Sequence, residues 1–216
     1  LPKIAEWVRA GSFYIDLGSD PRSWFPAGFE LVETWWVVFL HHDNFIEAAG
    51  LEFLLLAGTS TCALARWLGA SLRGAALAGL TAISVPGLWL QSLSCLNDAP
   101  AAALLVAAAA LITGRVPFPL LIFVAGLAAG LKPTTVYAAG GLLLLYLWVK
   151  KDPPAWRGQQ TAPWMLAALG LILGGCWYVR TWILKGTPLY PVGTAEILAG
   201  TGGPMQRLGP SLGALL

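Results

Sequence analysis

Long apolar stretches dominate this chain of 216 residues, and they constrain its fold more than any motif does. The stretch 116–149 carries Lys132 as its one charged side chain. Hydrophobic residues make up 57% of the sequence and charged residues 11%, which is far from the composition of soluble proteins. The chain is therefore predicted to be an integral membrane protein.

The apolar stretch 116–149 is too long to be one membrane span. A single helix of that length would measure about 50 Å, against a hydrocarbon core of about 30 Å. Pro133 disfavours helical geometry at Lys132, so the sequence around Lys132 predicts a tight turn between two spans. Lys132 then lies at a membrane face, either as a lysine that extends its ammonium group to the interface or as a residue that faces a ligand.

The same reasoning along the chain predicts an all-α fold, a polytopic transmembrane bundle of about six helices. The expected spans are residues 45–68, 74–93, 99–113, 116–131, 134–149 and 162–182. Residues 1–42 mix acidic, aromatic and turn-forming residues, which is typical of an outer loop with interfacial helices. The resulting division is an outer loop at 1–42, the bundle at 43–185 and a second outer loop at 186–216.

The charge distribution predicts the orientation. The loops 66–73, 114–115 and 150–160 fall on one side and hold six of the 13 basic residues, with Asp152 as their only acid. Short loops rich in Lys and Arg are the cytoplasmic ones. The acid-rich side with the first loop is therefore expected to face outward.

Charges of both signs are expected to meet on that outer side. Cations there would attract anionic phosphate, and a carboxylate would activate a hydroxyl acceptor, with a divalent metal ion as a candidate cofactor. Solvated loop charges are the competing interpretation, which we prefer for Asp16, Asp20 and Glu33. The residues in question are Asp16, Asp20, Glu30, Glu33, Asp98, Lys132, Arg180 and Lys185.

Several of these residues also have ordinary structural explanations. Asn97 and Asp98 precede Pro100 at a helix start, so Asp98 is expected to cap that helix. Glu30 begins an aromatic helix and can be an interfacial charge. Adjacent His41 and His42 point about 100° apart on a helix, which argues against a shared metal.

Glu52 and the three cysteines complete the set of candidate residues. Glu52 falls deep enough in its span to need a partner that the sequence does not identify. The cysteines, Cys62, Cys95 and Cys176, have no metal-type spacing and are expected to pack as small apolar residues.

Six segments, in order, resemble the GT-C superfamily of membrane glycosyltransferases. The similarity is to its bacterial branch of protein O-mannosyltransferases and lipid A aminoarabinose transferases. The segments are LPKIAEWVRAGS, FPAGFELVETWW, ARWLGAS, SCLNDAP, GLAAGLKPTTVY and CWYVRTWILKGTPLYPV, of which the last is the most distinctive.

The resemblance implies roles for individual residues. It places Glu30 and Asp98 at the active cavity as candidate catalytic carboxylates. The candidate substrate-binding residues are Asn97, Lys132, Arg180 and Tyr190, with Lys132 and Arg180 as contacts for a lipid phosphate. It also implies that the chain is a fragment lacking the first span and that the chief catalytic Asp precedes Leu1.

The expected function is transfer of a sugar from a polyprenyl-phosphate donor to a lipid, glycan or protein acceptor at the outer face of a bacterial inner membrane. No nucleic-acid partner is expected. A transporter or flippase component for lipid-linked saccharides is the alternative, although transporters place charges near the midplane, often in repeated halves. A noncatalytic membrane module is a third possibility.

Overall fold

The computed structural model describes residues 2–13, 24–114, 116–149 and 161–190, and within these ranges the chain is all-helical, as predicted. A short 3-10 helix, η2 (Ile46–Ala48), leads into α3. The α-helices are α1 (Pro2–Ala10), α2 (Gly28–Leu40), α3 (Ala49–Trp67), α4 (Leu72–Ile83), α5 (Pro86–Ser92), α6 (Asp98–Thr113), α7 (Phe118–Leu131), α8 (Pro133–Val149) and α9 (Thr161–Lys185).

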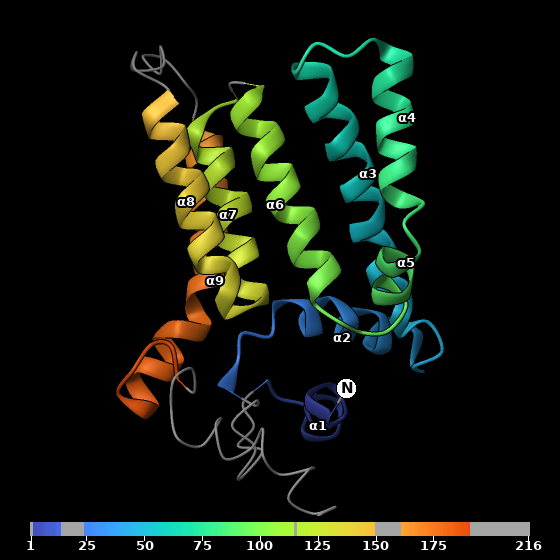
Figure 1. Ribbon diagram of the computed structural model, residues 1–216. Coiled ribbons are helices and arrows are strands. Elements are labelled where there is room, and N and C mark those ends of the chain that lie inside the picture. Colours follow the sequence, from blue (N-terminus) through green and yellow to red (C-terminus); the bar gives the residue numbers. More distant parts are fainter. Residues whose placement is uncertain (1, 14–23, 115, 150–160, 191–216) are drawn as a thin grey trace, which may run out of the picture.

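The longer helices form a bundle, and the shorter helices lie across one end of it (Figure 1). Helices α3, α4, α6, α7, α8 and α9 run roughly side by side, whereas α1, α2 and α5 lie at one end. We call this the rim end. Helix α6 begins there at Asp98, and α7 ends there just before Lys132. Arg66 and Arg73 flank the α3–α4 connection at the opposite end, which agrees with the predicted separation of the 66–73 loop from the acidic residues.

Two helical stretches are long and apolar enough to cross a membrane. These are Ile46–Trp67, which combines η2 and α3, and Thr161–Lys185, which is α9. Helices α4 and α5 together could make a third, bent span, while α6, α7 and α8 are apolar but shorter. The chain therefore has two to three candidate membrane-spanning helices, and their presence indicates membrane association.

The predicted span at 74–93 is not one continuous helix, because the chain breaks there into α4 and α5, which together can still make one bent span. The two helices are bent by 59° relative to each other. Pro86 has no backbone N–H and disfavours helical geometry in the residue before it, so Val85 is extended (φ −66°, ψ 116°). Pro86 thus breaks its apolar stretch as Pro133 breaks the stretch 116–149.

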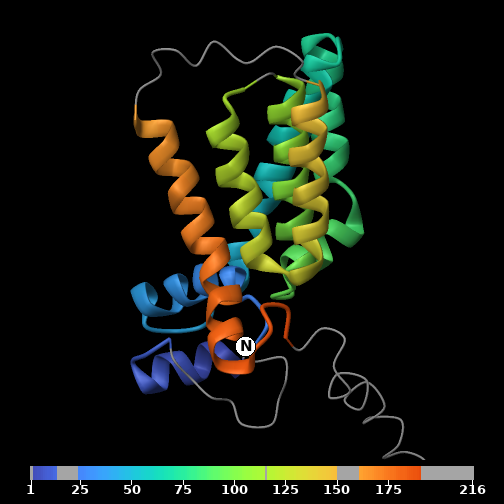
Figure 2. The same ribbon diagram turned by 90° about the vertical axis from the view of Figure 1, so that its left-hand side faces the viewer.

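Helices α7 and α9 run parallel and touch through glycines. Gly126 lies against Gly170 and Gly174, and Gly130 lies against Gly174. A Cβ atom added at Gly174 would come within 1.9 Å of the Gly126 carbonyl oxygen, so no larger residue fits at this separation. Small residues spaced four apart allow this close approach of membrane helices. The pairing carries α9 past the rim end of α7 (Figure 2).

The buried core is largest near the rim end. One cluster joins α2, α3, α6 and α7 through small and medium apolar side chains: Phe29, Ala49, Ala101, Leu104, Ala128 and Leu131. A second cluster joins α1 to α9 through Trp7 and Trp177, whose rings stack with centroids 6.3 Å apart. Helix α1 at the rim end is thus packed onto α9 by an aromatic contact.

Candidate functional site

The turn after α7 brings Lys132 to Asp98. Because Pro133 follows it, Lys132 is extended (φ −156°, ψ 139°), and α8 begins at once, which confirms the predicted break between the two helices. Thr135 stabilises the turn by donating from its hydroxyl to the Lys132 carbonyl at 2.6 Å. The Lys132 ammonium group forms an ion pair with the Asp98 carboxylate, and both side chains are partly exposed.

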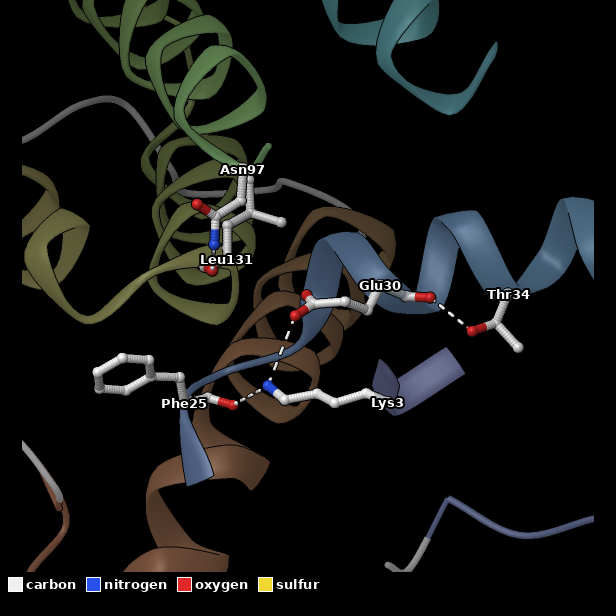
Figure 3. A network of polar contacts seen from close by, with 6 residues as sticks. All are labelled: Lys3, Phe25, Glu30, Thr34, Asn97 and Leu131. Carbon is white, nitrogen blue, oxygen red and sulfur yellow. Dashed lines mark hydrogen bonds and ion pairs between the residues drawn. The ribbon is translucent and has the colours of Figure 1, made fainter. Parts of the chain in front are cut away.

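The predicted capping role of Asp98 is wrong. Asn97 occupies the N-cap of α6, and Asp98 is the first helical residue. Asn97 makes no side-chain capping bond. Its amide nitrogen instead donates to the Leu131 carbonyl oxygen at 3.0 Å (Figure 3). The start of α6 is therefore bound to the end of α7 by two contacts from adjacent residues.

Glu30 lies in the first turn of α2 and pairs with α1. The Lys3 ammonium nitrogen lies 3.5 Å from Glu30 Oε1 and donates to the Phe25 carbonyl at 3.1 Å (Figure 3). The second carboxylate oxygen, Oε2, is buried and has no hydrogen-bond partner among the described residues. Gly28 packs α2 against Gly130 at the end of α7, so Glu30 and Lys132 belong to neighbouring elements.

Arg180 and Tyr190 belong to a separate aromatic group at the rim end. The Arg180 guanidinium lies 5.0 Å from the Trp24 ring centroid and 5.5 Å from that of Trp177. The Lys185 ammonium lies 4.6 Å from the Trp24 ring and 5.2 Å from the Tyr190 ring. Both cations thus lie within cation–π distance of the Trp24 indole, whose ring face attracts positive charge.

The structure therefore gathers the candidate residues into two groups. Asn97, Asp98 and Lys132 form one, with Glu30 on the adjacent helix, and Arg180 and Tyr190 form the other. The Tyr178 hydroxyl donates to the Ala129 carbonyl at 2.6 Å, which fixes α9 beside the last turn of α7. All of these side chains lie towards the same end of the helices.

An apolar cavity of about 460 Å³ opens beside the first group. Its walls come from α2, α3, α6, α7 and α9, and among the described residues Glu52 is the one ionisable side chain that lines it. The cavity runs from the rim end along the helices. Its lining near the rim end includes Gly28, Leu31, Glu52, Gly130 and Leu131, and its lining farther along the helices includes Leu104, Leu127 and Leu173. Pockets of this size and lining suit the apolar part of a small ligand or lipid.

Glu33 differs from the expectation that it is a solvated loop charge. It is 1% exposed, and its Oε1 atom is buried without a hydrogen-bond partner in the described part of the chain. Burial, with a smaller contribution from the nearby Glu30 carboxylate, raises the pKa of Glu33 to about 7. Its spacing of four residues from the buried Phe29 places both on one face of α2, a signal the sequence analysis did not use.

The other candidate residues are Glu52, Asp16 and Asp20, together with a candidate metal site. Glu52 is exposed to the cavity instead of buried against a partner. Asp16 and Asp20 lie outside the described residues. In the ranges that the structure describes, no three His, Cys, Asp or Glu side chains form a group that could hold a metal ion, so we derive no step through a metal.

Comparisons with protein-family models, with curated proteins and with solved structures give no match for this chain.

Proposed function

We propose that this protein is an integral membrane glycosyltransferase that transfers a sugar from a polyprenyl-phosphate donor to an acceptor at the outer face of a bacterial inner membrane. The observation that carries the proposal is the junction of the apolar cavity with the charged rim end. Leu131 lines the cavity, and the next residue, Lys132, holds the ion pair with Asp98. A lipid phosphate needs this combination of an apolar groove ending at a cation.

The polar part of the donor would lie between the two charged groups. Lys132 offers a compact cation and Arg180 a planar guanidinium, and both are suited to phosphate. Bound phosphate would compete with Asp98 for Lys132, so donor binding would release the Asp98 carboxylate. The aromatic side chains of Trp24 and Tyr190 provide flat apolar surfaces next to Arg180 and Lys185.

The reaction would be a single displacement at the anomeric carbon. The acceptor hydroxyl or amine attacks that carbon, the bond to the phosphate oxygen breaks, and polyprenyl phosphate leaves. A carboxylate takes the proton of the acceptor. Glu30 and Asp98 are the candidates: Glu30 pairs with Lys3 through Oε1 while its Oε2 has no hydrogen-bond partner in the described part of the chain, and Asp98 would be released from Lys132 by bound phosphate.

The finer fold assignment belongs to the same proposal. We infer that α6, α7 and α8, of 16, 14 and 17 residues, complete a polytopic bundle with α3, α4, α5 and α9. At about 1.5 Å per residue they measure roughly 21 to 26 Å, which fits a locally thinned bilayer. Helix α2, with Trp35 and Phe39 exposed at 63% and 62%, would then lie in the outer interface.

A transporter or flippase component for lipid-linked saccharides is the second candidate. One observation favours it, the break between α4 and α5, since broken helices are frequent in transporters. In transporters the break lies near the binding site at the membrane midplane. Here α5 lies at the rim end (Figure 1), which suits a site open to one side.

The test is a Lys132→Ala substitution in the protein reconstituted in liposomes and supplied with a panel of polyprenyl-phosphate sugars. Loss of a charged contact to phosphate costs about 1.5 to 3 kcal/mol, so the donor KM should rise by roughly 10- to 100-fold. Arg73→Ala is the matched control, because Arg73 is an exposed cation at the opposite end and should leave the donor KM unchanged.

Two results would contradict the proposal. One is an unchanged donor KM in Lys132→Ala. The other is the absence of sugar transfer from every donor by the unsubstituted protein, and movement of the lipid-linked sugar between leaflets in that case would favour the transporter.

A further inference from the structure

Helix α1 contacts both charged groups of the candidate site. It has nine residues and lies at the rim end, so it is too short to cross a membrane. Trp7 on its buried face is 5% exposed, and Lys3, one turn earlier, reaches α2. Arg9, whose side chain is 76% exposed, pairs instead with Glu6 of the same helix. The inward contacts of α1 are therefore those of Lys3 and Trp7.

The contact of Lys3 is an ion pair that is mostly buried. The Lys3 ammonium nitrogen lies 3.5 Å from Glu30 Oε1 and donates to the Phe25 carbonyl at 3.1 Å (Figure 3). The side chains of Lys3 and Glu30 are only 13% and 20% exposed. Such a pair is weak evidence for stability, because desolvation of the two charges offsets their attraction. It does fix geometry, since one ammonium group holds both the Glu30 carboxylate and the backbone just before α2.

The contact of Trp7 leads to α9. Its ring stacks on that of Trp177, with centroids 6.3 Å apart, and Trp177 is 7% exposed. The Arg180 guanidinium lies 5.5 Å from the centroid of the same Trp177 ring. Trp177 and Arg180 are three residues apart, so they lie on one face of α9. Trp7 therefore packs against the side chain that supports Arg180.

These contacts connect the two charged groups through one short helix. Glu30 belongs to the group that contains Lys132, and Arg180 belongs to the other. Lys3 and Trp7 are four residues apart, so they lie on one face of α1, about 6 Å apart along its axis. A rigid helix with these two contacts sets the separation of the carboxylate and the guanidinium.

We propose that α1 is a positioning helix, in which Lys3 orients the Glu30 carboxylate and Trp7 supports Arg180 through Trp177. Neither Lys3 nor Trp7 has to touch the substrate, because each acts through its partner. The inference rests on the proposed function in placing sugar transfer between the two charged groups and in requiring Glu30 for the transfer step. The contacts of α1 themselves can be tested without that function.

Sugar transfer by the full protein in liposomes tests the role of Lys3. Lys3→Met removes the charge, so kcat should fall by roughly 10- to 100-fold, with the donor KM changed by less than about threefold. Lys3→Arg keeps the cation and should restore most of the lost kcat. Because Lys3 acts through Glu30, adding Lys3→Met to Glu30→Gln should lower kcat by less than about twofold more. Arg9→Met is the matched control on the exposed side of α1 and should leave kcat unchanged.

Trp7→Leu tests the second contact. The donor KM should rise by about three- to tenfold, because Arg180 loses the support of the stacked rings. In an Arg180→Ala background the same substitution should leave the donor KM unchanged. An equal rise in both backgrounds would mean that Trp7 does not act through Arg180 and would overturn this part of the proposal.

The unfolding midpoint in detergent tests the Lys3–Glu30 contact independently of sugar transfer. Lys3→Met leaves the Glu30 carboxylate mostly buried without its cation and should lower the midpoint by about 5 °C. In a Glu30→Gln background the same substitution should lower it by less than half as much. If the unsubstituted protein transfers no sugar, the proposed function fails, and these midpoints alone decide the inference.

Three results would overturn the role of Lys3. The first is an equal fall of the midpoint in both backgrounds, which would mean that the two side chains are not coupled. The second is an unchanged kcat in Lys3→Met. The third is a loss of kcat on Lys3→Met that is as large in Glu30→Gln as in the natural protein, because Lys3 would then act on the reaction by another route.

Discussion

Glu30 and Glu33 lie one turn apart on α2, yet they meet different surroundings. Glu30 pairs with Lys3, whereas Glu33 is almost completely buried and its Oε1 atom has no hydrogen-bond partner among the described residues. The pKa of Glu33 is raised from 4.5 to about 7 mainly because burial disfavours its charge. The folded protein therefore holds this proton more tightly than the unfolded chain does.

This difference predicts how stability depends on pH. Because the folded-state pKa is the higher one, the contribution of Glu33 is fully present below about pH 4.5 and declines as the pH rises through about 7. The loss should amount to about 2 to 3 kcal/mol. The measurement is the thermal unfolding midpoint in detergent from pH 5 to 8. The midpoint should fall with pH in the natural protein and stay flatter in Glu33→Gln.

Glu47→Gln is the control, since Glu47 lies in η2 and is exposed, so its removal should leave the pH slope in place. Equal slopes in the natural protein and in Glu33→Gln would mean that Glu33 does not control this dependence.

The candidate residues show what a sequence can predict at this scale. The extended geometry at Lys132 follows from Pro133, since that restriction is local. The pairing of Asp98 with Lys132 spans 34 residues and depends on how α6 and α7 pack, so residue spacing alone pointed to a cap instead. The burial of Glu33 was missed for the same reason. Its charge suggested a solvated side chain, whereas its burial depends on which elements pack against α2.

At the scale of helices, the glycines of α7 and α9 explain why these two elements lie so close. Gly174 faces the Gly126 backbone, whereas nothing lies within 4 Å of a Cβ atom added at the adjacent Gly175. This neighbouring pair offers a matched comparison within one turn of α9.

Gly174→Ala should destabilise the protein, and Gly175→Ala should not. The added methyl group at position 174 meets backbone atoms, which cannot rotate away, so a cost of about 1 to 3 kcal/mol is expected. At position 175 the higher helix propensity of alanine should leave stability unchanged or raise it by up to about 1 kcal/mol. The unfolding midpoint in detergent measures both, and similar midpoints would contradict the close pairing.

Helix boundaries were predictable where a proline or the length of an apolar stretch determines where a helix ends, and less so elsewhere. The boundaries of α6, α8 and α9 lie within three residues of the expected spans. The α4–α5 break was missed because an apolar stretch of span length was read without weighing Pro86. Which helices pair with which is set by side-chain packing across long separations, and no local pattern encodes it.

At the scale of the whole molecule, the positions of the helix ends determine which polar residues come together. Because α6 and α8 begin where α7 ends, the topology collects their polar ends with α1 and α2 (Figure 1). The sequence predicted that these charges share one side. It could not predict the cavity, because its walls come from five helices that are distant along the chain.

The cavity gives the last prediction. Leu127 lines it, so Leu127→Trp should fill much of its volume, whereas Leu80→Trp on α4, where Leu80 is 57% exposed, adds the same side chain outside it. If the cavity holds the lipid chain of the donor, Leu127→Trp should weaken binding of a long-chain polyprenyl phosphate by about tenfold, as expected for about 1.4 kcal/mol of lost apolar contact.

Chain length separates this effect from a general disturbance of the site. A polyprenyl phosphate of two isoprene units keeps the phosphate but has little chain to place in the cavity, so its affinity should be similar in Leu127→Trp and in the natural protein. Lys132→Ala should weaken both ligands, because both carry the phosphate. Native mass spectrometry of the detergent-solubilised protein measures all four combinations. Equal weakening of the long and short ligands by Leu127→Trp would mean that the cavity is not where the chain binds.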